Sequence, residues 1–295
     1  MDLHLHIGAH KTATTYLQER FHADRVVFEQ RGTALAPRTL FRGRVSPRLG
    51  GFGTAVQSHQ DVRRLRSAHD AAVRCNSRRL IISDENLLGG LGDVFRTGEL
   101  YQKPGRRLLP LARQWRAGKR RVMLAVRAYS TFWPSVYSHW VRRHGYQPYD
   151  AELRSRLFRG TRGWADVVAE LNAALPQAEL IVWRYEDFDA LENAILTEIL
   201  GHLETVSAMK PRRKRSHWGL SAAAVAEMEA VAVDGRRMNA QQVRGLAKQH
   251  PRWKGNPPFD PWDAPETEEL SKRYARDLER IAAMPTVKLL TPSQR

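Results

Sequence analysis

Four short apolar segments constrain the fold of this 295-residue chain more than any other feature of its sequence. None of them alternates strictly between apolar and polar residues, as a strand with one solvent-exposed face would. Short, continuous apolar runs are typical of strands that are buried on both faces of a parallel sheet. The predicted strands are Leu3–Ile7, Leu80–Ser83, Val122–Val126 and Leu180–Trp183.

Helical patterns separate these strands. Apolar residues recur at helical spacing in the segments Thr14–Phe28, Ser58–Val73 and Trp164–Leu175. Strands that alternate with helices indicate βαβ units. We therefore expect an α/β fold with three layers, in which helices cover both faces of a central, mainly parallel sheet.

The last third of the chain has a different, mostly helical pattern. We expect helices at Leu191–His202, Ser221–Val233 and Glu266–Met284, and a loop at Pro251–Pro265, where repeated prolines prevent regular structure. Neither an internal repeat nor a segment with the composition of a flexible linker interrupts the sequence. Residues 1–295 are therefore expected to form a single domain with a helical C-terminal portion.

The chain is strongly basic. It has 48 Lys and Arg residues against 31 Asp and Glu residues, which gives a formal net charge of +17. Such a charge attracts polyanions, among them nucleic acid, anionic lipid, acidic glycans and nucleotide phosphates, but it does not select one of them. A generally basic surface without a specific partner is the alternative interpretation.

Other features of the sequence favour a cytoplasmic location. The one cysteine, Cys75, cannot form an intramolecular disulfide. No apolar run approaches the roughly 18 residues of a membrane-spanning helix, so no transmembrane segment is expected. The N-terminus lacks the basic start and the small-residue cleavage site of a signal peptide.

Polar residues follow each of the four predicted strands. The first strand is followed by Gly8–Thr15, the second by Asp84–Asn86, the third by Arg127 and the fourth by Arg184–Asp187. Ligands of open α/β sheets bind beyond the carboxyl ends of the strands, so these residues are the first candidates for a site. Agreement at four strand ends is a stronger signal than any single motif.

The segment after the first strand has the composition of a phosphate-binding loop. Gly8 allows a tight turn, Lys11 supplies a mobile cation, and the helix start that follows presents unpaired N–H groups to an anion. The pattern that binds nucleoside triphosphates requires glycine directly before the lysine, where this chain has His10. An ordinary capped helix beside a lysine is the alternative. The loop residues expected to bind the anion are Gly8, Ala9, His10, Lys11, Thr12, Ala13, Thr14 and Thr15.

A second anion-binding element is expected at Arg127, which follows the third strand, and Ser135, eight residues later. Arginine offers a planar fork for two parallel hydrogen bonds to a phosphate, and the serine hydroxyl adds a further donor. Four aromatic residues nearby have near-helical spacing, which favours packing in a core over stacking on a base. These residues are Phe132, Trp133, Tyr137 and Trp140.

Together these segments resemble the bacterial type of PAPS-dependent sulfotransferase, where PAPS is 3′-phosphoadenosine 5′-phosphosulfate. His6–Gln18, which reads HIGAHKTATTYLQ, resembles the 5′-phosphosulfate loop of that family, and Arg127 with Ser135 resembles its 3′-phosphate motif. Ile81–Leu87 and Leu180–Phe188 resemble two further segments of the family, in the same order. The resemblance is specific over these four segments and becomes faint after about residue 205.

The resemblance implies a fold like that of the P-loop kinases and a defined reaction. A sulfuryl group would pass from PAPS to a hydroxyl or amine of an acceptor by in-line displacement, with adenosine 3′,5′-bisphosphate as the product and no metal required. The implied roles are the bridging oxygen and leaving phosphate for Lys11, the phosphosulfate for the loop threonines and amides, and the 3′-phosphate for Arg127 and Ser135.

A general base must take the proton of the acceptor. Glu85 is our first choice, because it follows the second strand and should face the crevice at the edge of the sheet. Its alternative role is that of an acid at a helix start, which the helix dipole favours. Asp84 and His10 are the other candidates. Tyr185–Asp187 is expected to be structural, since a strand-end acid can cap a following helix.

Three departures from the family pattern affect the expected site. Ala13 replaces a glycine, so residue 13 is expected to avoid positive φ. Ala128–Tyr129 replaces a frequent Asp-Pro pair. Arg213 and Lys214 are candidates for a late loop that holds the 3′-phosphate in many members, but the glycine of that loop is missing, and a solvated basic surface is the alternative.

No metal site is expected. His4 and His6 face the same side of the first strand, but no third ligand accompanies them, so packing or a surface position is the preferred interpretation.

The acceptor is left open as an anionic glycan or a small molecule, and no nucleic acid partner is expected. Residues Ala36–Phe52 and Tyr146–Arg162 are candidates for the loops of its pocket. Two other functions remain as alternatives. One is a P-loop kinase-like phosphotransferase, which would need magnesium, and the other is a non-catalytic protein that binds polyanions.

Overall fold

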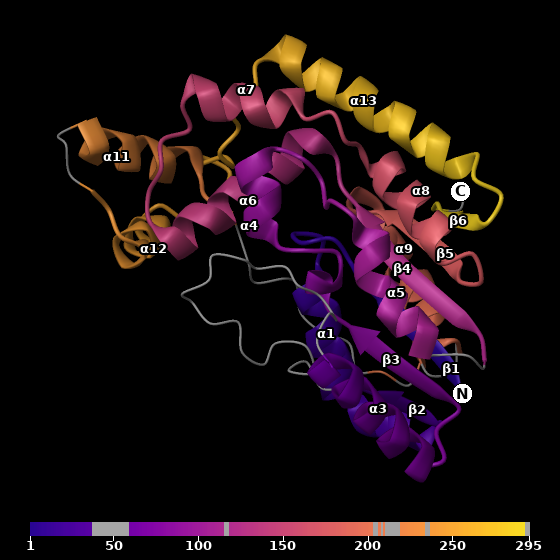
Figure 1. The fold of residues 1–295 in the computed structure, drawn as a ribbon. Coiled ribbons are helices and arrows are strands. Elements are labelled where there is room, and N and C mark those ends of the chain that lie inside the picture. The colour runs from indigo at the N-terminus through magenta and orange to yellow at the C-terminus, as the bar shows by residue number, and fades with distance from the viewer. Residues whose placement is uncertain are drawn as a thin grey trace.

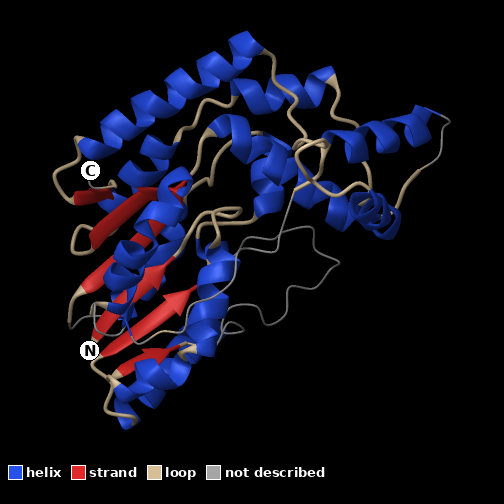
Figure 2. Cartoon of the chain, turned by 180° about the vertical axis from the view of Figure 1, so that it is seen from behind, coloured by secondary structure: helices blue, strands red, loops and turns tan. Residues whose placement is uncertain are grey.

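The computed structural model describes residues 1–36, 59–114, 118–202, 206–207, 209, 219–233 and 237–292. Within these residues the centre is a six-stranded, entirely parallel sheet in the order β2-β3-β1-β4-β5-β6, with helices on both sides (Figure 1 and Figure 2). The expected α/β class with a central parallel sheet is confirmed. The strands are β1 (Asp2–His6), β2 (Thr33–Leu35), β3 (Arg79–Ser83), β4 (Arg120–Val126), β5 (Glu179–Arg184) and β6 (Val287–Leu290).

The four predicted strands are the inner ones, β3, β1, β4 and β5. The edge strands β2 and β6 were not predicted from the sequence. They have three and four residues, and most of their side chains are only partly buried. A short edge strand does not need a continuous apolar run, so the pattern that marks the inner strands is missing there.

Five predicted helices are confirmed with small shifts at their ends: α3, α8, α9, α11 and α13. The predicted loop at Pro251–Pro265 is also confirmed as far as Asp263, which caps α13. The helices in the described residues are α1 (Thr14–Ala23), α2 (Arg25–Gln30), α3 (His59–Arg74), α4 (Leu91–Thr97), α5 (Pro104–Gln114), α6 (Tyr129–His144), α7 (Ala151–Arg159), α8 (Trp164–Ala174), α9 (Phe188–Leu200), α11 (Ala222–Val233), α12 (Ala240–Gln249) and α13 (Ala264–Ala282).

The periodicity of Thr14–Phe28 predicted a single helix, but the segment forms two. Asp24 takes a non-helical conformation, with φ −102° and ψ 16°, and separates α1 from α2. Across this break Phe28 of α2 packs edge to face against Phe21 of α1, with ring centroids 6.3 Å apart. The apolar periodicity therefore continues through a break in the helix and does not reveal it.

The segment Tyr146–Arg162 was expected to be a loop, but it is one only in part. It contains α7, which begins after Asp150, where the aspartate side chain accepts a hydrogen bond from the N–H of Leu153 at 2.8 Å. Leu153 and Leu157 bury one face of this helix. Residues 37–52 of the other proposed pocket loop lie outside the described residues.

Alternate residues of the inner strands face two different cores. On one face, Leu5 and Leu124 pack in a cluster with residues of α5, α8 and α13. On the other face, Met123 and Ile181 pack in a cluster with residues of α1, α2 and α9. Both faces of the sheet need apolar side chains, which explains why the inner strands do not alternate with polar residues.

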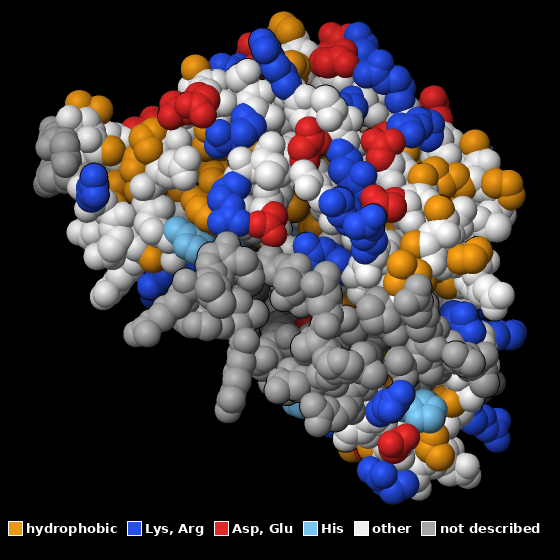
Figure 3. Space-filling model, viewed as in Figure 1, with side chains coloured by type: hydrophobic (Ala, Val, Ile, Leu, Met, Phe, Trp, Pro, Cys, Tyr) orange, Lys and Arg blue, Asp and Glu red, His pale blue; other side chains and the backbone are white. Residues whose placement is uncertain are grey.

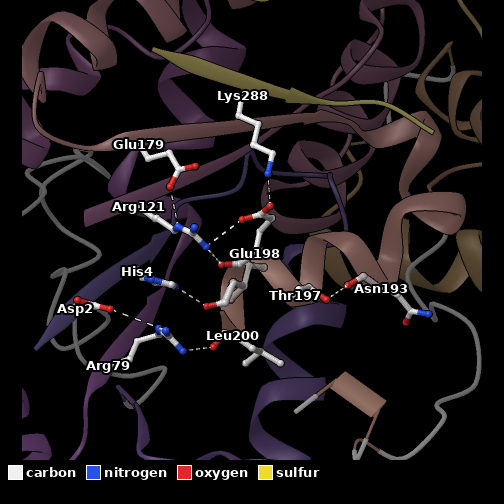
Figure 4. A network of polar contacts seen from close by, with 11 residues as sticks. Asp2, His4, Arg79, Arg121, Glu179, Asn193, Thr197, Glu198, Leu200 and Lys288 are labelled. Atoms are coloured by element: carbon white, nitrogen blue, oxygen red, sulfur yellow. Dashed lines mark hydrogen bonds and ion pairs between the residues drawn. The ribbon is translucent and has the colours of Figure 1, made fainter. Parts of the chain in front are cut away.

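Ion pairs and hydrogen bonds hold α9 against the amino ends of the strands (Figure 4). Glu198 pairs with Arg121 of β4 at 3.0 Å and with Lys288 of β6 at 2.5 Å. Arg79 of β3 donates to the carbonyl oxygen of Leu200. Cations at the end of a helix interact favourably with its dipole. The amino edge of the sheet is thus occupied by structural contacts, which leaves the carboxyl edge for a ligand site.

The C-terminal portion contributes helices at two places and a strand. α12 packs on α6 and α11 packs on α12, at the end of the molecule farthest from β6 (Figure 1). α13 covers α8, and β6 joins the sheet beside β5. In the described ranges no helix is both long enough and apolar enough to cross a bilayer.

A buried carboxylate ties three helices together below the carboxyl edge of the sheet. Asp277 of α13 accepts hydrogen bonds from the hydroxyl of Tyr129 and, at 2.9 Å, from the N–H of Trp164 at the start of α8. The indole N–H of Trp164 donates to the carbonyl oxygen of Arg127 at 2.8 Å. The contacts of Asp277 therefore fix the backbone that carries the candidate Arg127.

Asp277→Ala should lower the free energy of unfolding by about 2–3 kcal/mol, because buried donors lose their acceptor. Urea denaturation followed by circular dichroism measures this change. The control is Glu269→Ala on the same helix, which removes an exposed ion pair with Arg276 and should change the unfolding free energy by less than about 0.5 kcal/mol. Equal effects of the two substitutions would contradict the role of Asp277.

Candidate functional site

The loop that joins β1 to α1 lies at the middle of the carboxyl edge of the sheet. β1 pairs with β3 on one side and with β4 on the other, and His6 at its end is level with Ser83 and Met123. The chain passes from β1 to β2 and β3 on one side of the sheet, and to β4, β5 and β6 on the other. Such a reversal of strand order opens a crevice at the carboxyl ends of the strands, where ligands of open α/β sheets bind.

The backbone of this loop has three residues with positive φ: Gly8 at 42°, Lys11 at 68° and Ala13 at 63°. A Cβ atom on Gly8 would lie 2.4 Å from Oγ1 of Thr14, so the tight turn requires glycine. The expectation that Ala13 avoids positive φ is wrong. Residue 13 is the N-cap of α1 and is left-handed, which costs alanine roughly 1–2 kcal/mol.

Hydrogen bonds within the loop hold this conformation. The hydroxyl of Thr12 donates to the carbonyl oxygen of Ala9 at 2.6 Å and accepts from the N–H of Ala9 at 3.2 Å. The hydroxyl of Thr14 donates to the same carbonyl oxygen at 3.2 Å. Both threonines are buried, so their hydroxyls shape the loop from inside, whereas Thr15 is partly exposed.

The amino terminus of α1 has the properties of an anion site. Its N-cap, Ala13, makes no side-chain capping bond, and its first turn contains no acidic residue. The first N–H groups of a helix have no acceptor within the helix, and together they present a partial positive charge. The N–H groups at Thr14, Thr15 and Tyr16 are therefore suited to a phosphate or sulfate group.

Lys11 lies in a cluster of cations. Burial, and after it the positive charges of Arg127, Arg142 and Arg252, together lower its pKa to about 8. The four side chains come from the β1 loop, the end of β4, helix α6 and the segment between α12 and α13. Like charges this close repel one another, and a bound anion would relieve the repulsion.

Many other charges of the protein are paired at the surface. Over α13, acidic side chains lie beside basic ones (Figure 3). Examples are Arg280 with Asp166 at 2.8 Å and Lys272 with Glu268 at 2.6 Å. The net charge of the chain is thus partly neutralised in this region, whereas the charges that act on Lys11 are positive.

The structure brings Arg127 directly to the β1 loop. Its Nη1 donates to the carbonyl oxygen of Lys11 at 2.6 Å, and its Nε donates to the hydroxyl of Thr131 at 3.0 Å. The guanidinium group lies 4.5 Å from the ring centre of Tyr185. Ser135 is partly exposed one helical turn after Thr131, on the same face of α6.

Arg252 was missed by the sequence interpretation. Its Nε donates to the carbonyl oxygen of Leu220 at 2.9 Å. The guanidinium group packs closely against Gly219, where an added Cβ atom would lie only 2.4 Å from Nη2. Burial and the charge of Arg127 lower its pKa. No motif links positions 127 and 252 along the chain. The one available signal was the position of Arg252 in a basic, Pro-rich loop. Arg213 and Lys214, the residues proposed for a late basic loop, lie outside the described residues.

The acids after β3 have different contacts. Asp84 is buried and caps a short 3₁₀ helix, where its Oδ1 accepts from the N–H and the side-chain amide of Asn86 at 3.0 and 2.7 Å. Glu85 is partly exposed, and its Oε2 accepts from Nε2 of Gln18 at 3.0 Å. The amide of Gln18 also donates to the carbonyl oxygen of Ser83 at 3.1 Å. Asp84 therefore has a structural role, while Glu85 lies at the crevice with a fixed orientation.

His10, the third candidate base, is buried against Tyr101 with the two rings stacked 5.8 Å apart. Its backbone N–H donates to the hydroxyl of Tyr101 at 2.9 Å. This loop amide is therefore engaged by protein and differs from the helix-start amides that follow it.

Glu186, the acid after β5, has a structural role, but it acts at α6 and not at the following helix α9, which has no side-chain cap. Glu186 accepts from the N–H of Ala128 at 2.9 Å and from the hydroxyl of Tyr274 at 3.0 Å. It thereby supplies a carboxylate at the amino terminus of α6, which the helix dipole favours. Asp187 lies 3.5 Å from Arg184.

His4 and His6 pack in the core. Nδ1 of His4 is 2.7 Å from the carbonyl oxygen of Ile199, and Nδ1 of His6 is 2.8 Å from the hydroxyl of Ser83. Burial lowers the pKa of both rings to about 4, so both are neutral near pH 7. Across the described part of the chain, no three His, Cys, Asp or Glu side chains are grouped so that they could hold a metal.

Three comparisons with known proteins found no match to this chain: one with models of protein families, one with curated proteins and one with solved structures.

Ala13→Gly should raise the free energy of unfolding by roughly 0.5–1 kcal/mol, because glycine adopts the left-handed conformation without strain and loses only part of this gain to backbone entropy. Ala226→Gly, at an exposed position inside α11, is the matched control and should lower the unfolding free energy by about 1 kcal/mol. Urea denaturation measures both changes, and a loss of stability in Ala13→Gly would show that residue 13 does not have positive φ.

Proposed function

We propose that this protein is a sulfotransferase of the PAPS-dependent type, with a P-loop-kinase-like fold. The observation that carries the proposal is the 2.6 Å hydrogen bond from Arg127 to the carbonyl oxygen of Lys11. The 5′- and 3′-phosphates of PAPS are carried by one ribose, so the elements that bind them must lie side by side. The two segments that resemble those elements are in contact, although 116 residues separate them in sequence.

The donor would be held by two groups of residues. The phosphosulfate would bind at the amino terminus of α1, beside the ammonium group of Lys11, where the helix-start amides can donate to its oxygens. The 3′-phosphate would bind at Arg127 and Ser135, and Arg252 supplies a further cation near Arg127. Arginine suits this role because its fork can form two hydrogen bonds to one phosphate.

The chemistry requires one bond to form at sulfur while another breaks. An oxygen or nitrogen of the acceptor attacks the sulfur atom, and the bond from sulfur to the bridging oxygen of PAPS breaks in line. Lys11 and the helix-start amides would stabilise the negative charge that develops on the leaving phosphate. Glu85 would take the proton of the acceptor, with its orientation fixed by Gln18.

Two observations make the kinase alternative weaker. The residue before Lys11 is His10, and its backbone N–H donates to Tyr101, whereas a triphosphate loop uses a glycine at this position and offers its amides to the phosphates. The buried Asp84 is engaged by Asn86 and does not have the exposure of a magnesium ligand. A non-catalytic polyanion-binding protein would not need a glycine turn, a lysine and an arginine gathered at one strand edge.

Nucleotide titration tests the proposal. Isothermal calorimetry with adenosine 3′,5′-bisphosphate should give a dissociation constant of about 1 μM, near −8 kcal/mol, with much weaker binding of ADP and of ATP with magnesium. Arg127→Ala should remove the preference for the bisphosphate over ADP. Arg25→Ala is the control, because it removes the same charge from an exposed ion pair with Glu29 far from the cluster.

Each other outcome of this titration points to another function. Tighter binding of ATP with magnesium would support the kinase-like alternative. Absence of nucleotide binding, together with binding of acidic polymers that weakens steeply with salt, would support the polyanion-binding alternative.

Affinity for the bisphosphate should also depend on pH, because the pKa of Lys11 is lowered to about 8. A bound phosphate favours the ammonium form, and the phosphates themselves are fully ionised above about pH 7. The affinity should be nearly constant from pH 7 to 8 and then fall by up to about tenfold per pH unit, because a proton must be taken up on binding.

Calorimetry from pH 7 to 10, in buffers with different ionisation enthalpies, measures this loss of affinity and the proton uptake together. Lys11→Arg is the control, because arginine stays charged over the whole range and should give a flat profile. A flat profile in the unchanged protein would mean that Lys11 does not contact the anion.

A further inference from the structure

Tyr101 makes a double contact with the loop at His10. Its hydroxyl oxygen lies 2.9 Å from the backbone nitrogen of His10 and 2.9 Å from Nδ1 of the same residue. The two rings are nearly parallel, at 17°, and both side chains are buried. One tyrosine therefore holds both the backbone and the ring of the residue that precedes Lys11.

The direction of these hydrogen bonds follows from the number of protons available. The backbone N–H of His10 can only donate, so the hydroxyl oxygen of Tyr101 accepts from it. The hydroxyl proton then needs an acceptor, and in the described part of the chain Nδ1 of His10 is the acceptor within reach. Nδ1 is consequently unprotonated, and the proton of the neutral ring is on Nε2.

The contact of Nε2, on the opposite side of the ring, supports the same tautomer. Nε2 of His10 lies 3.4 Å from Oδ1 of Asn86. If the amide of Asn86 turned its NH₂ group toward His10, it would lose the hydrogen bond that Nδ2 donates to Asp84 at 2.7 Å. An oxygen therefore faces Nε2, and it favours a proton there. Two independent contacts thus favour the Nε2–H tautomer.

The other neutral tautomer would leave two buried groups without suitable partners. With a proton on Nδ1, the hydroxyl of Tyr101 would receive two N–H donors and its own proton would have no acceptor. At the same time the lone pair of Nε2 would face the oxygen of Asn86. The loss of one partner by a buried polar group is enough to favour the Nε2–H tautomer over the Nδ1–H tautomer about tenfold.

We propose that Tyr101 is a positioning residue that fixes His10 as the Nε2–H tautomer, and that His10 is for this reason a hydrogen-bond donor to a phosphate or sulfate oxygen rather than a base. The distance of 3.4 Å to Asn86 is longer than an ordinary N–H···O bond, so the Nε2 proton can be shared with an anion beside Lys11. The tautomer stands on its own, whereas the contact with an anion rests on the proposed function. The arrangement leaves Glu85 as the proton acceptor of the site.

Nitrogen NMR of protein labelled with ¹⁵N-histidine tests the tautomer. The chain has 11 histidines, and the signals of His10 are identified by their loss in His10→Gln. We expect a protonated Nε2 and an unprotonated Nδ1 in the unchanged protein, and a mixture of both tautomers in Tyr101→Phe, which keeps the ring. A protonated Nδ1 in the unchanged protein, or an unchanged ratio in Tyr101→Phe, would overturn the proposal.

Tyr137→Phe is the matched control, because it also removes one tyrosine hydroxyl bond, to the carbonyl oxygen of Gln147 at 2.7 Å. Tyr137 lies on α6, whereas Tyr101 lies between α4 and α5. Tyr137→Phe should leave the signals of His10 unchanged. Thermal melting of both variants shows whether they remain folded, and a Tyr101→Phe protein that is folded but has lost its tautomer preference cannot be explained by general loss of structure.

Calorimetry with adenosine 3′,5′-bisphosphate tests the role of the donor. His10→Ala, which removes the donor, should weaken binding about tenfold, the value of one hydrogen bond to a charged group. Tyr101→Phe should weaken binding only about twofold, because a mixture of tautomers keeps part of the protein in the donor form, and Tyr137→Phe should bind like the unchanged protein. Equal binding by His10→Ala would overturn the role of His10 as a donor. If the bisphosphate does not bind even to the unchanged protein, the proposed function fails, and the tautomer is still decided by NMR.

Discussion

The pairing of β1 between β3 and β4 determines where this chain can carry out chemistry. Parallel pairing brings the carboxyl ends of all three strands to one edge, so that Lys11, Glu85 and Arg127 follow neighbouring strands. Helices cover both faces of the sheet, and structural ion pairs occupy its amino edge (Figure 1 and Figure 4). The carboxyl edge is therefore the place where loop amides and charged side chains can meet a ligand.

The loop at this edge combines two unfavourable features, a strained backbone and a group of like charges. Lys11 and Ala13 adopt positive φ, and Lys11 is near three arginines. The hydroxyls of Thr12 and Thr14 hold the conformation by bonding inward to Ala9. Strain of this kind persists only where surrounding contacts enforce it, and it is concentrated at functional sites. The threonines, which a sequence motif presents as ligand donors, thus serve to keep the amides that follow in position.

Sequence patterns predicted the parts of the fold whose residues act locally. The inner strands are continuous apolar runs, and helices such as α3 and α8 repeat one periodicity along their length. The strand ends that carry Lys11 and Arg127 follow from the strand pattern. β2 and β6 were missed because a short edge strand has no continuous apolar run. The error at Ala13 arose because local preference was trusted where loop hydrogen bonds decide the conformation.

Other parts of the site could not be read from the sequence because they depend on contacts between distant segments. Tyr101 is 91 residues from His10, and no spacing rule connects them. Arg252 is placed by the carbonyl of Leu220, whose N–H in turn donates to Ser138 of α6 at 3.1 Å. Such links are created by tertiary packing, and a linear pattern contains no trace of them.

The link from α6 through Leu220 to Arg252 also bears on the size of the functional unit. A chain that ended near residue 205 would keep every segment that resembles the sulfotransferases. It would lack Arg252, the strand β6 and the carboxylate of Asp277 that fixes the start of α8. On the proposed function, the smallest unit able to hold both phosphates of one nucleotide is therefore longer than the stretch that carries the recognisable motifs, and its last cation comes from the part of the chain with the faintest resemblance.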